Sequence, residues 1–111
     1  MSVSKPLSGV KVLELGNFLS VPSCTKMLSD LGADVIKVEQ GSGDTFRYFG
    51  PVFKIPAKED QNACFDLMNG GKRSVVIDMK TAEGMETFYD LLNTADIFVT
   101  NIREKGLKHL G

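Results

Sequence analysis

The segments Val10-Lys11-Val12-Leu13-Glu14-Leu15 and Asp34-Val35-Ile36-Lys37-Val38-Glu39 set the architecture of this chain. Each is a short run dominated by β-branched and other apolar side chains, which is typical of a β-strand. The sequence between them has helical periodicity. A strand, a helix and a second strand form a unit in which both strands run parallel, so the chain is predicted to begin with a βαβ unit.

The helix between these strands is expected to begin near Pro22, because proline fits the first turn, where its missing N–H is not needed. It is expected to end at Gly32, since glycine readily adopts the left-handed conformation found just after many helices. Four side chains fall on one face at helical spacing and are expected to pack on the sheet: Cys24, Met27, Leu28 and Leu31. This apolar setting predicts that Cys24 is a buried hydrophobic residue and not a nucleophile.

The second half of the chain continues the pattern. Ser74–Asp78 and Ala95–Thr100 are predicted strands, Thr81 is the expected N-cap of a helix between them, and Arg103–Leu110 is predicted to be a short helix. The longer helix is expected to bury Met85, Phe88, Leu91 and Leu92. The predicted fold class is therefore α/β, a Rossmann-like parallel sheet with flanking helices. Two full helices and one short helix cover the two faces of a four-stranded sheet poorly. The chain is therefore expected to be the beginning of a larger protein.

The segment from Gln40 to Arg73 is predicted to be one long excursion, because glycine and proline interrupt it repeatedly. A short helical turn is expected at Asn62–Met68. Loops of this length in a compact domain are usually functional or cover another part of the structure. The aromatic side chains of the excursion would either roof a pocket or pack onto the sheet: Phe46, Tyr48, Phe49, Phe53 and Phe65.

The composition argues against several classes of protein. Thirteen Lys and Arg against 14 Asp and Glu give a formal net charge of −1, without the basic excess of a nucleic-acid binder. No apolar run approaches the roughly 20 residues of a membrane span, and Met1–Pro6 contains no apolar region of a secretory signal. Cys24 and Cys64 are therefore expected to be reduced thiols in a cytoplasmic protein.

The candidate binding site lies beyond the carboxyl ends of the strands, where open parallel sheets bind their ligands. The residues at these ends are small or polar: Gly16–Ser20, Glu39–Gly43, Asp78–Lys80 and Asn101–Arg103. The first of these loops lacks the glycine pattern of a dinucleotide site. Glu39 is either a ribose-binding acid or a solvated strand end. Gly41–Asp44 is either a phosphate-binding loop or, as we favour, an ordinary turn.

The remaining reactive and charged residues form no recognisable catalytic group. Lys72, Arg73 and Lys80 flank the third strand and would either bind phosphate or, by pattern alone, serve solubility. Cys64 has no visible activating partner, and the single histidine, His109, belongs to no Ser-His-Asp or Cys-His arrangement. The Cys, His and carboxylate spacings are not those of a metal site. The residues alone thus indicate a ligand site without identifying its chemistry.

A series of motifs runs in order along practically the whole chain. The most specific are Leu31-Gly32-Ala33-Asp34-Val35-Ile36-Lys37-Val38-Glu39, then Lys72-Arg73-Ser74, Asp78-Met79-Lys80-Thr81 and Glu83-Gly84. They are extended by Pro6–Leu15, Pro22, Cys24-Thr25, Gly43-Asp44, Asn69, Ala95-Asp96, Asn101 and Leu110-Gly111. Together these segments closely resemble the start of family III CoA-transferases, the CaiB/BaiF type.

The resemblance implies that residues 1–111 are the N-terminal portion of a Rossmann-like large domain in a longer enzyme. Members of the family move CoA from an acyl-CoA donor to a carboxylic acid through a catalytic aspartate. That aspartate lies beyond this chain, so no catalytic residue is expected within it. The CoA thioester is a co-substrate, and no covalently bound cofactor or metal is expected. The longer protein is expected to form an interlocked homodimer, and the 111-residue chain alone is expected to be inactive and to fold poorly.

The resemblance also implies which residues contact CoA: Asn17, Phe18, Leu19, Ser20, Gln40, Ile77, Asp78, Met79, Lys80, Asn101, Ile102, Arg103 and His109. This chain departs from the family in three places. Its first loop has an unusual sequence, Gln40 stands where Arg is frequent, and His109 stands where Arg is usual. Arg47 or Lys72 is expected to compensate for the charge missing at Gln40.

Within the family, three segments look most like the transferases that act on 2-hydroxy acids and aryl-lactates in amino-acid-fermenting anaerobes: Asn17-Phe18, Phe53–Asn69 and Thr100–Arg103. Two alternatives stay open. An α-methylacyl-CoA racemase shares the fold and the N-terminal pattern, and its acid and base residues also lie further along. The other alternative is a non-catalytic CoA-binding fragment.

Overall fold

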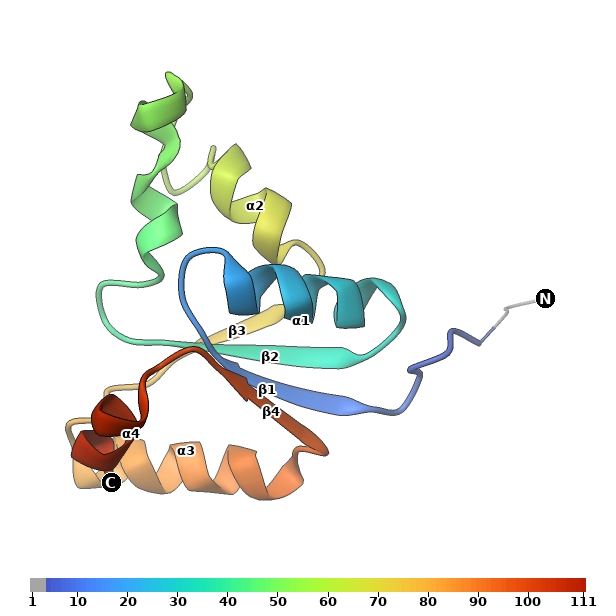
Figure 1. Ribbon diagram of the computed structural model, residues 1–111, viewed down its shortest axis with the longest axis vertical. Coiled ribbons are helices and arrows are strands. Elements are labelled where there is room, and N and C mark those ends of the chain that lie inside the picture. The colour runs from blue at the N-terminus through green and yellow to red at the C-terminus, as the bar shows by residue number, and fades with distance from the viewer. Residues whose placement is uncertain (1–3) are drawn as a thin grey trace.

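A four-stranded parallel sheet forms the middle of the structure, with the strands in the order β3-β2-β1-β4 (Figure 1). The computed structural model describes residues 4–111, so the first part of the segment Met1–Pro6 lies outside the described residues. The strands are β1 (Lys11–Leu15), β2 (Asp34–Glu39), β3 (Arg73–Val76) and β4 (Ile97–Thr100). The α-helices are α1 (Ser20–Asp30), α2 (Ala63–Asn69), α3 (Ala82–Thr94) and α4 (Glu104–Leu110), and two 3₁₀ helices are η1 (Thr45–Tyr48) and η2 (Gly50–Phe53). Within residues 4–111, no helix has the length and apolarity needed to cross a membrane.

All strand pairs are parallel, which confirms the predicted α/β sheet. β1 is central: it pairs with β2 on one side and with β4 on the other. The third and fourth strands are shorter than predicted, and β3 already ends at Val76. The chain leaves the sheet there because Ile77 and Met79 turn into the core, while the Asp78 carboxylate accepts the N–H of Lys80 in a tight turn.

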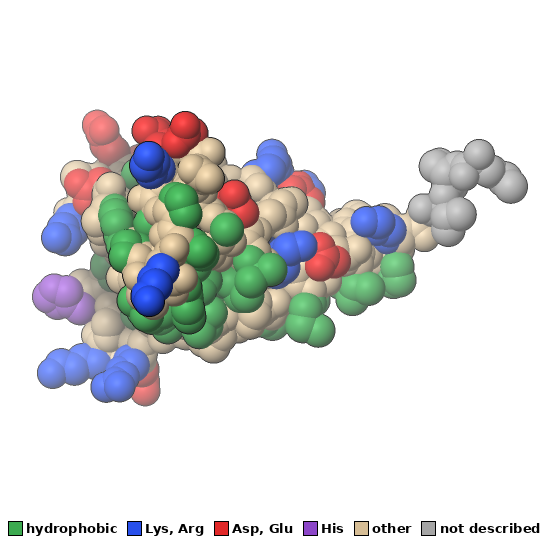
Figure 2. Space-filling model, turned by 90° about the horizontal axis from the view of Figure 1, so that it is seen from above, with side chains coloured by type: hydrophobic (Ala, Val, Ile, Leu, Met, Phe, Trp, Pro, Cys, Tyr) green, Lys and Arg blue, Asp and Glu red, His purple; other side chains and the backbone are tan. Residues whose placement is uncertain are grey.

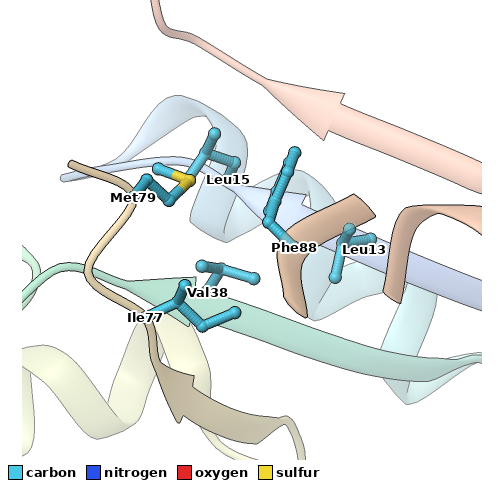
Figure 3. Packing of buried hydrophobic residues seen from close by; sticks show 6 residues of the cluster. All are labelled: Leu13, Leu15, Val38, Ile77, Met79 and Phe88. Carbon is cyan, nitrogen blue, oxygen red and sulfur yellow. The ribbon is translucent and has the colours of Figure 1, made fainter. Parts of the chain in front are cut away.

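α3 and α4 cover one face of the sheet (Figure 1). The core on this face consists of Leu13, Leu15, Val38, Ile77, Met79 and Phe88 (Figure 3). Thr81 caps α3 by accepting the N–H of Gly84, as predicted. The predicted inward positions of Phe88 and Leu92 are confirmed, because Phe88 is buried and Leu92 packs against the same core.

α1 covers the opposite face but turns a different side to the sheet than predicted. The buried residues of α1 are Val21, Pro22 and Thr25. Leu28 packs against the second core cluster, as predicted. The predicted burial is wrong for Cys24, Met27 and Leu31, which are exposed. The reason is polar: the hydroxyl of Thr25 donates to the buried carboxylate of Glu14, which brings the Thr25 face inward.

The excursion between β2 and β3 rises on the α1 side of the sheet (Figure 1). Its helical turn is confirmed as α2, whose N-cap is Asn62. Phe46 and Phe49 pack edge-to-face on Phe18 from the loop after β1, with ring centroids 5.1 and 4.9 Å apart. Phe53 packs in turn on Phe49. The aromatic residues of η1 and η2 therefore fasten the excursion to the carboxyl end of β1.

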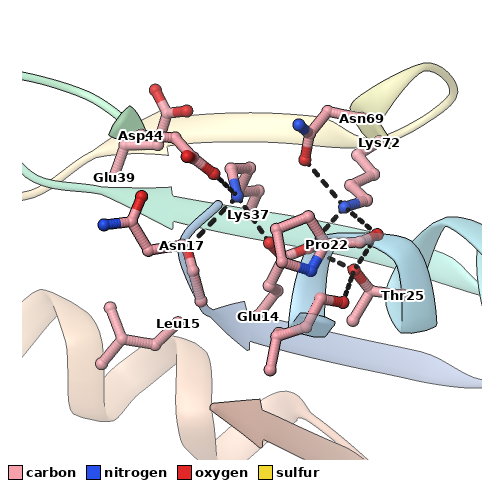
Figure 4. Close-up of polar contacts among 12 residues, drawn as sticks. Glu14, Leu15, Asn17, Pro22, Thr25, Lys37, Glu39, Asp44, Asn69 and Lys72 are labelled. Atoms are coloured by element: carbon pink, nitrogen blue, oxygen red, sulfur yellow. Dashed lines mark hydrogen bonds and ion pairs between the residues drawn. The ribbon is translucent and has the colours of Figure 1, made fainter. Parts of the chain in front are cut away.

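A chain of buried charges lies under α1, and it links β1 and β2 to the excursion (Figure 4). Glu14 of β1 and Lys37 of β2 have completely buried side chains, and the Lys37 ammonium donates to Glu14 Oε2 at 2.6 Å. Lys37 also lies 2.8 Å from Asp44 Oδ2, an ion pair without hydrogen-bond geometry. The Lys72 ammonium donates to Glu14 Oε1 at 2.7 Å. Two carboxylates thus face two ammonium groups, so the cluster is neutral.

The ammonium groups of the cluster also donate hydrogen bonds to uncharged oxygen atoms. Lys72 also donates to the carbonyl of Pro22 at 2.9 Å and to Asn69 Oδ1 at 2.8 Å. Burial lowers the pKa of Lys72, although the neighbouring Glu14 carboxylate opposes that effect. Buried charges are tolerated only when they are paired and hydrogen-bonded. The packing of α1 and the excursion on this face therefore depends on the complete set of four charges.

The substitution Lys37→Met tests the buried charge cluster. It removes the cation between Glu14 and Asp44, so it leaves uncompensated buried charge. We expect the free energy of unfolding to fall by about 3–5 kcal/mol, measured by urea denaturation with circular dichroism. Arg73→Met is the matched control, because Arg73 forms an exposed ion pair with Asp34 that water screens. Equal losses in the two variants would contradict this account.

The substitution Gly84→Ala tests the packing of α3 against the Asp78 turn. A Cβ atom at Gly84 would lie 1.8 Å from the carbonyl oxygen of Asp78, so the start of α3 would have to move. We expect a loss of about 1–3 kcal/mol in stability, the usual cost of overpacking, measured by thermal unfolding. At Gly41 a Cβ would meet no atom within 4 Å, so Gly41→Ala should leave the midpoint nearly unchanged.

Candidate functional site

The loops that follow β1 and β4 meet at the carboxyl edge of the sheet, as expected. The N–H of Asn17 donates to Asn101 Oδ1 at 3.1 Å, and Asn101 Nδ2 donates to the carbonyl of Asn17 at 2.9 Å. Asn101 also donates to the hydroxyl of Ser20, the first residue of α1, at 3.2 Å. The strand order changes direction at β1, because β2 and β3 lie on one side of it and β4 lies on the other. Open α/β sheets form their ligand crevice at such a switch point.

The loop after β2 joins the same junction. Asn17 Oδ1 accepts the N–H of Thr45 at 2.8 Å and its hydroxyl at 3.1 Å. Both side-chain amides, Asn17 and Asn101, therefore hold three loops together. Sequence reasoning assigned these two residues to ligand contact and missed their role as links between loops, because the partners lie far apart in the chain.

A polar cavity of about 260 Å³ lies at this junction. It is lined by three of the predicted site residues, Asn17, Gln40 and Ile102, together with Glu39 and residues of the turn after β2. Glu39 is buried, so the prediction of a solvated strand end is wrong. Its carboxylate pairs with Arg47, whose Nη2 lies 2.9 Å from Glu39 Oε2. This pairing needs η1 to fold back over the strand end, a contact that no local pattern reveals.

Gly41–Asp44 begins in a turn, as favoured, in which the N–H of Gly43 donates to the carbonyl of Gln40 at 2.7 Å. The role of its last residue, Asp44, was not predicted. Asp44 is buried, and its Oδ1 accepts the N–H groups of both Phe18 and Phe46 at 2.9 Å. Phe18 has a left-handed backbone with φ +71°, which is uncommon for a residue other than glycine. The sequence offered only one signal for this role, an acidic residue directly after the Gly41–Gly43 turn.

Both cations expected to replace the charge missing at Gln40 form ion pairs within the protein. The Lys72 side chain is buried and paired with Glu14, which also excludes a role in solubility. Arg47 is paired with Glu39 and stacks on the ring of Phe65, 3.5 Å from its centroid. Arg73 pairs with Asp34 at the amino end of β2, on the opposite edge of the sheet.

A second cavity, of about 380 Å³, contains Lys80 and His109. The first follows β3 and the second lies in the last turn of α4, so tertiary packing brings them together. Both side chains are exposed. Ile77 and Met79 are buried in the core, and Met79 also lines this cavity, whereas Asp78 is exposed and shapes the turn. Arg103 is exposed at the N-terminus of α4.

A third cavity, of about 390 Å³, is almost entirely apolar and lies between α2, the 3₁₀ helices and the loop after β1. It is lined by Leu19, Phe46, Phe49, Phe53, Ile55, Ala63, Cys64, Leu67 and Met68. Figure 2 looks down on the excursion and shows apolar side chains gathered there around a basic side chain. Of the aromatic residues expected either to roof a pocket or to pack onto the sheet, Phe46, Phe49 and Phe53 line this cavity, whereas Phe65 lies under Arg47.

A polar cavity, a cavity with two basic groups and an apolar cavity border the same end of the sheet, and the loops between them are cross-linked by hydrogen bonds. Cys64 is buried among apolar residues, and Cys24 is exposed on α1, away from the strand ends. The described residues 4–111 hold no group of three or more His, Cys, Asp or Glu side chains that could bind a metal ion.

Comparison with known proteins identifies this architecture. The chain is 50% identical over 105 residues to the (R)-2-hydroxy-4-methylpentanoate CoA-transferase of Clostridioides difficile, a match that covers 95% of this chain and 26% of the relative. It is 39% identical over 104 residues to the cinnamoyl-CoA:phenyllactate CoA-transferase of Clostridium sporogenes, covering 94% and 25%. The chain thus spans about a quarter of the length of these curated relatives.

The fold leads to the same family. The crystal structure of a CaiB/BaiF family protein from Brucella suis superposes with a TM-score of 0.86 at 39% identity, covering 97% of this chain and 29% of that one. The model of CoA-transferase family III matches residues 7–111. This match includes every strand and helix described above, so the chain belongs to CoA-transferase family III.

Proposed function

We propose that this chain forms the CoA-binding part of an enzyme that moves CoA from an acyl-CoA donor to a 2-hydroxy acid. The observation that carries the proposal is the junction of three strand-end loops, with a polar, a basic and an apolar cavity beside it. An acyl-CoA has three corresponding parts: a nucleotide, phosphate groups and an acyl group joined through the thiol of the pantetheine arm. Both relatives named above are CoA-transferases, and their names specify 2-hydroxy-acid substrates.

Lys80 and His109 are the proposed phosphate contacts. A lysine ammonium makes charge-assisted hydrogen bonds to phosphate, and Lys80 is exposed at the mouth of its cavity. Gln40 lines the polar cavity and offers an uncharged amide where a nucleotide would lie. Arg47 and Lys72 are engaged in ion pairs. The basic residues proposed to bind phosphate are therefore Lys80, His109 and the exposed Arg103.

The apolar cavity supports an acid whose side chain is branched or aromatic. Its lining offers Leu, Ile, Met and Phe side chains, and burying such a substrate group contributes about 1.5–3 kcal/mol. The cavity borders Leu19 of the first loop, which supports a position for an apolar substrate group close to the proposed CoA site.

The bond-breaking group is proposed to lie outside this chain. In the proposed reaction, a catalytic aspartate of the longer protein attacks the thioester carbonyl, CoA leaves as the thiolate, and an acyl-aspartyl anhydride forms. The role of residues 4–111 is then to bind and orient CoA. The longer protein is further proposed to work as a homodimer in the cytoplasm.

The substitution Lys80→Ala tests the phosphate contact. The host is a chimera in which residues 7–111 replace the corresponding quarter of the Clostridioides difficile relative. We expect CoA binding to weaken by about 1–3 kcal/mol, because a charge-assisted contact is lost, measured by isothermal titration calorimetry. Lys11→Ala is the matched control, since Lys11 is exposed at the opposite edge of the sheet. Unchanged affinity in Lys80→Ala would remove Lys80 from the site.

The chain alone is expected to have no transferase activity, because covalent catalysis needs the residue that carries the intermediate. The purified 111-residue chain is mixed with an acyl-CoA and 2-hydroxy acids with apolar side chains, and exchange is followed by mass spectrometry. The chimera serves as the positive control. Turnover by the chain itself would show that it contains the nucleophile. Racemisation without exchange in the chimera would favour the α-methylacyl-CoA racemase alternative.

A further inference from the structure

We propose that Asp44 is a positioning residue for the acyl-CoA substrate: it holds the loop Gly16–Ser20 in its binding conformation through the strained backbone of Phe18. This inference rests on the proposed function, since it assigns a task to a residue beside the proposed CoA site. Asp44 is not proposed to touch the reacting atoms.

Asp44 is the meeting point of three elements. Its Oδ1 accepts two N–H groups at 2.9 Å, one from Phe18 in the loop after β1 and one from Phe46 in η1. Its Oδ2 faces the Lys37 ammonium of β2 at 2.8 Å. The side chain is completely buried. A single carboxylate therefore connects the first loop, the excursion and the central part of the sheet.

The bond to Phe18 matters because of the conformation of that residue. Phe18 has φ +71°, a conformation that glycine adopts freely but that is strained for a residue with a β-carbon. Such a conformation persists only where its surroundings impose it. Two kinds of contact impose this conformation on Phe18. The Asp44 carboxylate accepts its N–H, and the Phe18 ring packs edge-to-face on Phe46 and Phe49.

Lys37 of β2 in turn positions the Asp44 carboxylate. Lys37 donates to the carboxylate of Glu14 and, at 3.3 Å, to the carbonyl of Gly16, the first residue of the loop. The buried charge cluster thus holds both Gly16 directly and Phe18 through Asp44. A charged acceptor binds an N–H more strongly than a neutral one, which suits a bond that must maintain a strained residue.

The conformation of Phe18 decides where its neighbours lie. Asn17 forms the junction with Asn101 and Thr45, and Leu19 lines the apolar cavity, so the two flanking residues serve different cavities. If the backbone at Phe18 relaxed, Asn17 and Leu19 could not both keep these positions. The loop that Asp44 holds therefore sets the spacing between the polar cavity and the apolar cavity.

The test is the substitution Asp44→Asn in the active chimera. The Asn oxygen still accepts an N–H, but the negative charge is lost and an NH₂ group faces the Lys37 ammonium. We expect the KM for acyl-CoA to rise about tenfold, while the KM for the 2-hydroxy acid changes less than twofold. A merely structural role would lower the folded fraction, which reduces kcat and leaves both KM values unchanged. Asp44→Glu should recover part of the acyl-CoA affinity, because it restores the charge.

Asp34→Asn is the matched control, because it makes the same chemical change in an exposed ion pair at the other edge of the sheet. It should leave both KM values unchanged. A second measurement uses Phe18→Gly, which removes the backbone strain. In the Phe18→Gly background, Asp44→Asn should raise the KM for acyl-CoA much less than tenfold, and this comparison remains informative if Asp44→Asn is poorly stable.

The outcomes separate the two proposals. A parent chimera that is folded but inactive would overturn the proposed function. An active parent whose KM for acyl-CoA is the same after Asp44→Asn would overturn only the positioning role of Asp44. An equal tenfold effect of Asp44→Asn with and without Phe18→Gly would show that Asp44 does not act through the backbone of Phe18.

Discussion

Two opposite charges on adjacent strands, Glu14 and Lys37, face the interior of the protein beneath α1. Neither can remain there without partners, because an unpaired buried charge costs several kcal/mol. The partners come from both ends of the excursion: Asp44 where it begins and Lys72 where it ends. The pairing requirement therefore folds a long, glycine-rich segment back onto the sheet.

The pairing of the buried charges also determines the position of the loop after β1 in the candidate site. Lys37 contacts the carbonyl of Gly16, and Asp44 binds the N–H of Phe18, so the loop after β1 is tied to the buried charges at two points. The amides of Asn17 and Asn101 then extend the connection to the loop after β4. The stability of the fold and the geometry of the candidate site are coupled here, because the residues that neutralise the interior also shape the loops at the strand ends.

The chain departs from the family pattern in ways that the structure makes intelligible. Gln40 leaves the polar cavity without a cation, and the nearest candidates are engaged, Arg47 with Glu39 and Lys72 with Glu14. The exposed basic groups Lys80 and His109 share a cavity instead. The apolar cavity lies under the excursion, on the α1 side of the sheet. The exposed basic groups and the apolar cavity are thus separate features of this end of the sheet.

The hydrophobic periodicity and the positions of glycine, proline and capping residues were sufficient to predict the strands, the helices and the loops at the strand ends. They also predicted the helix ends at Thr81 and Gly32. These features follow from interactions between near neighbours in the chain. The motifs were sufficient for the family. The burial of Lys72, Glu39 and Asp44 and the outward turn of Cys24, Met27 and Leu31 were not predictable in this way. A charged side chain looks solvated until its partner is known, and here the partners are many residues apart. Only packing in three dimensions brings those charges together, and the face that α1 buries follows from the bond between Thr25 and Glu14.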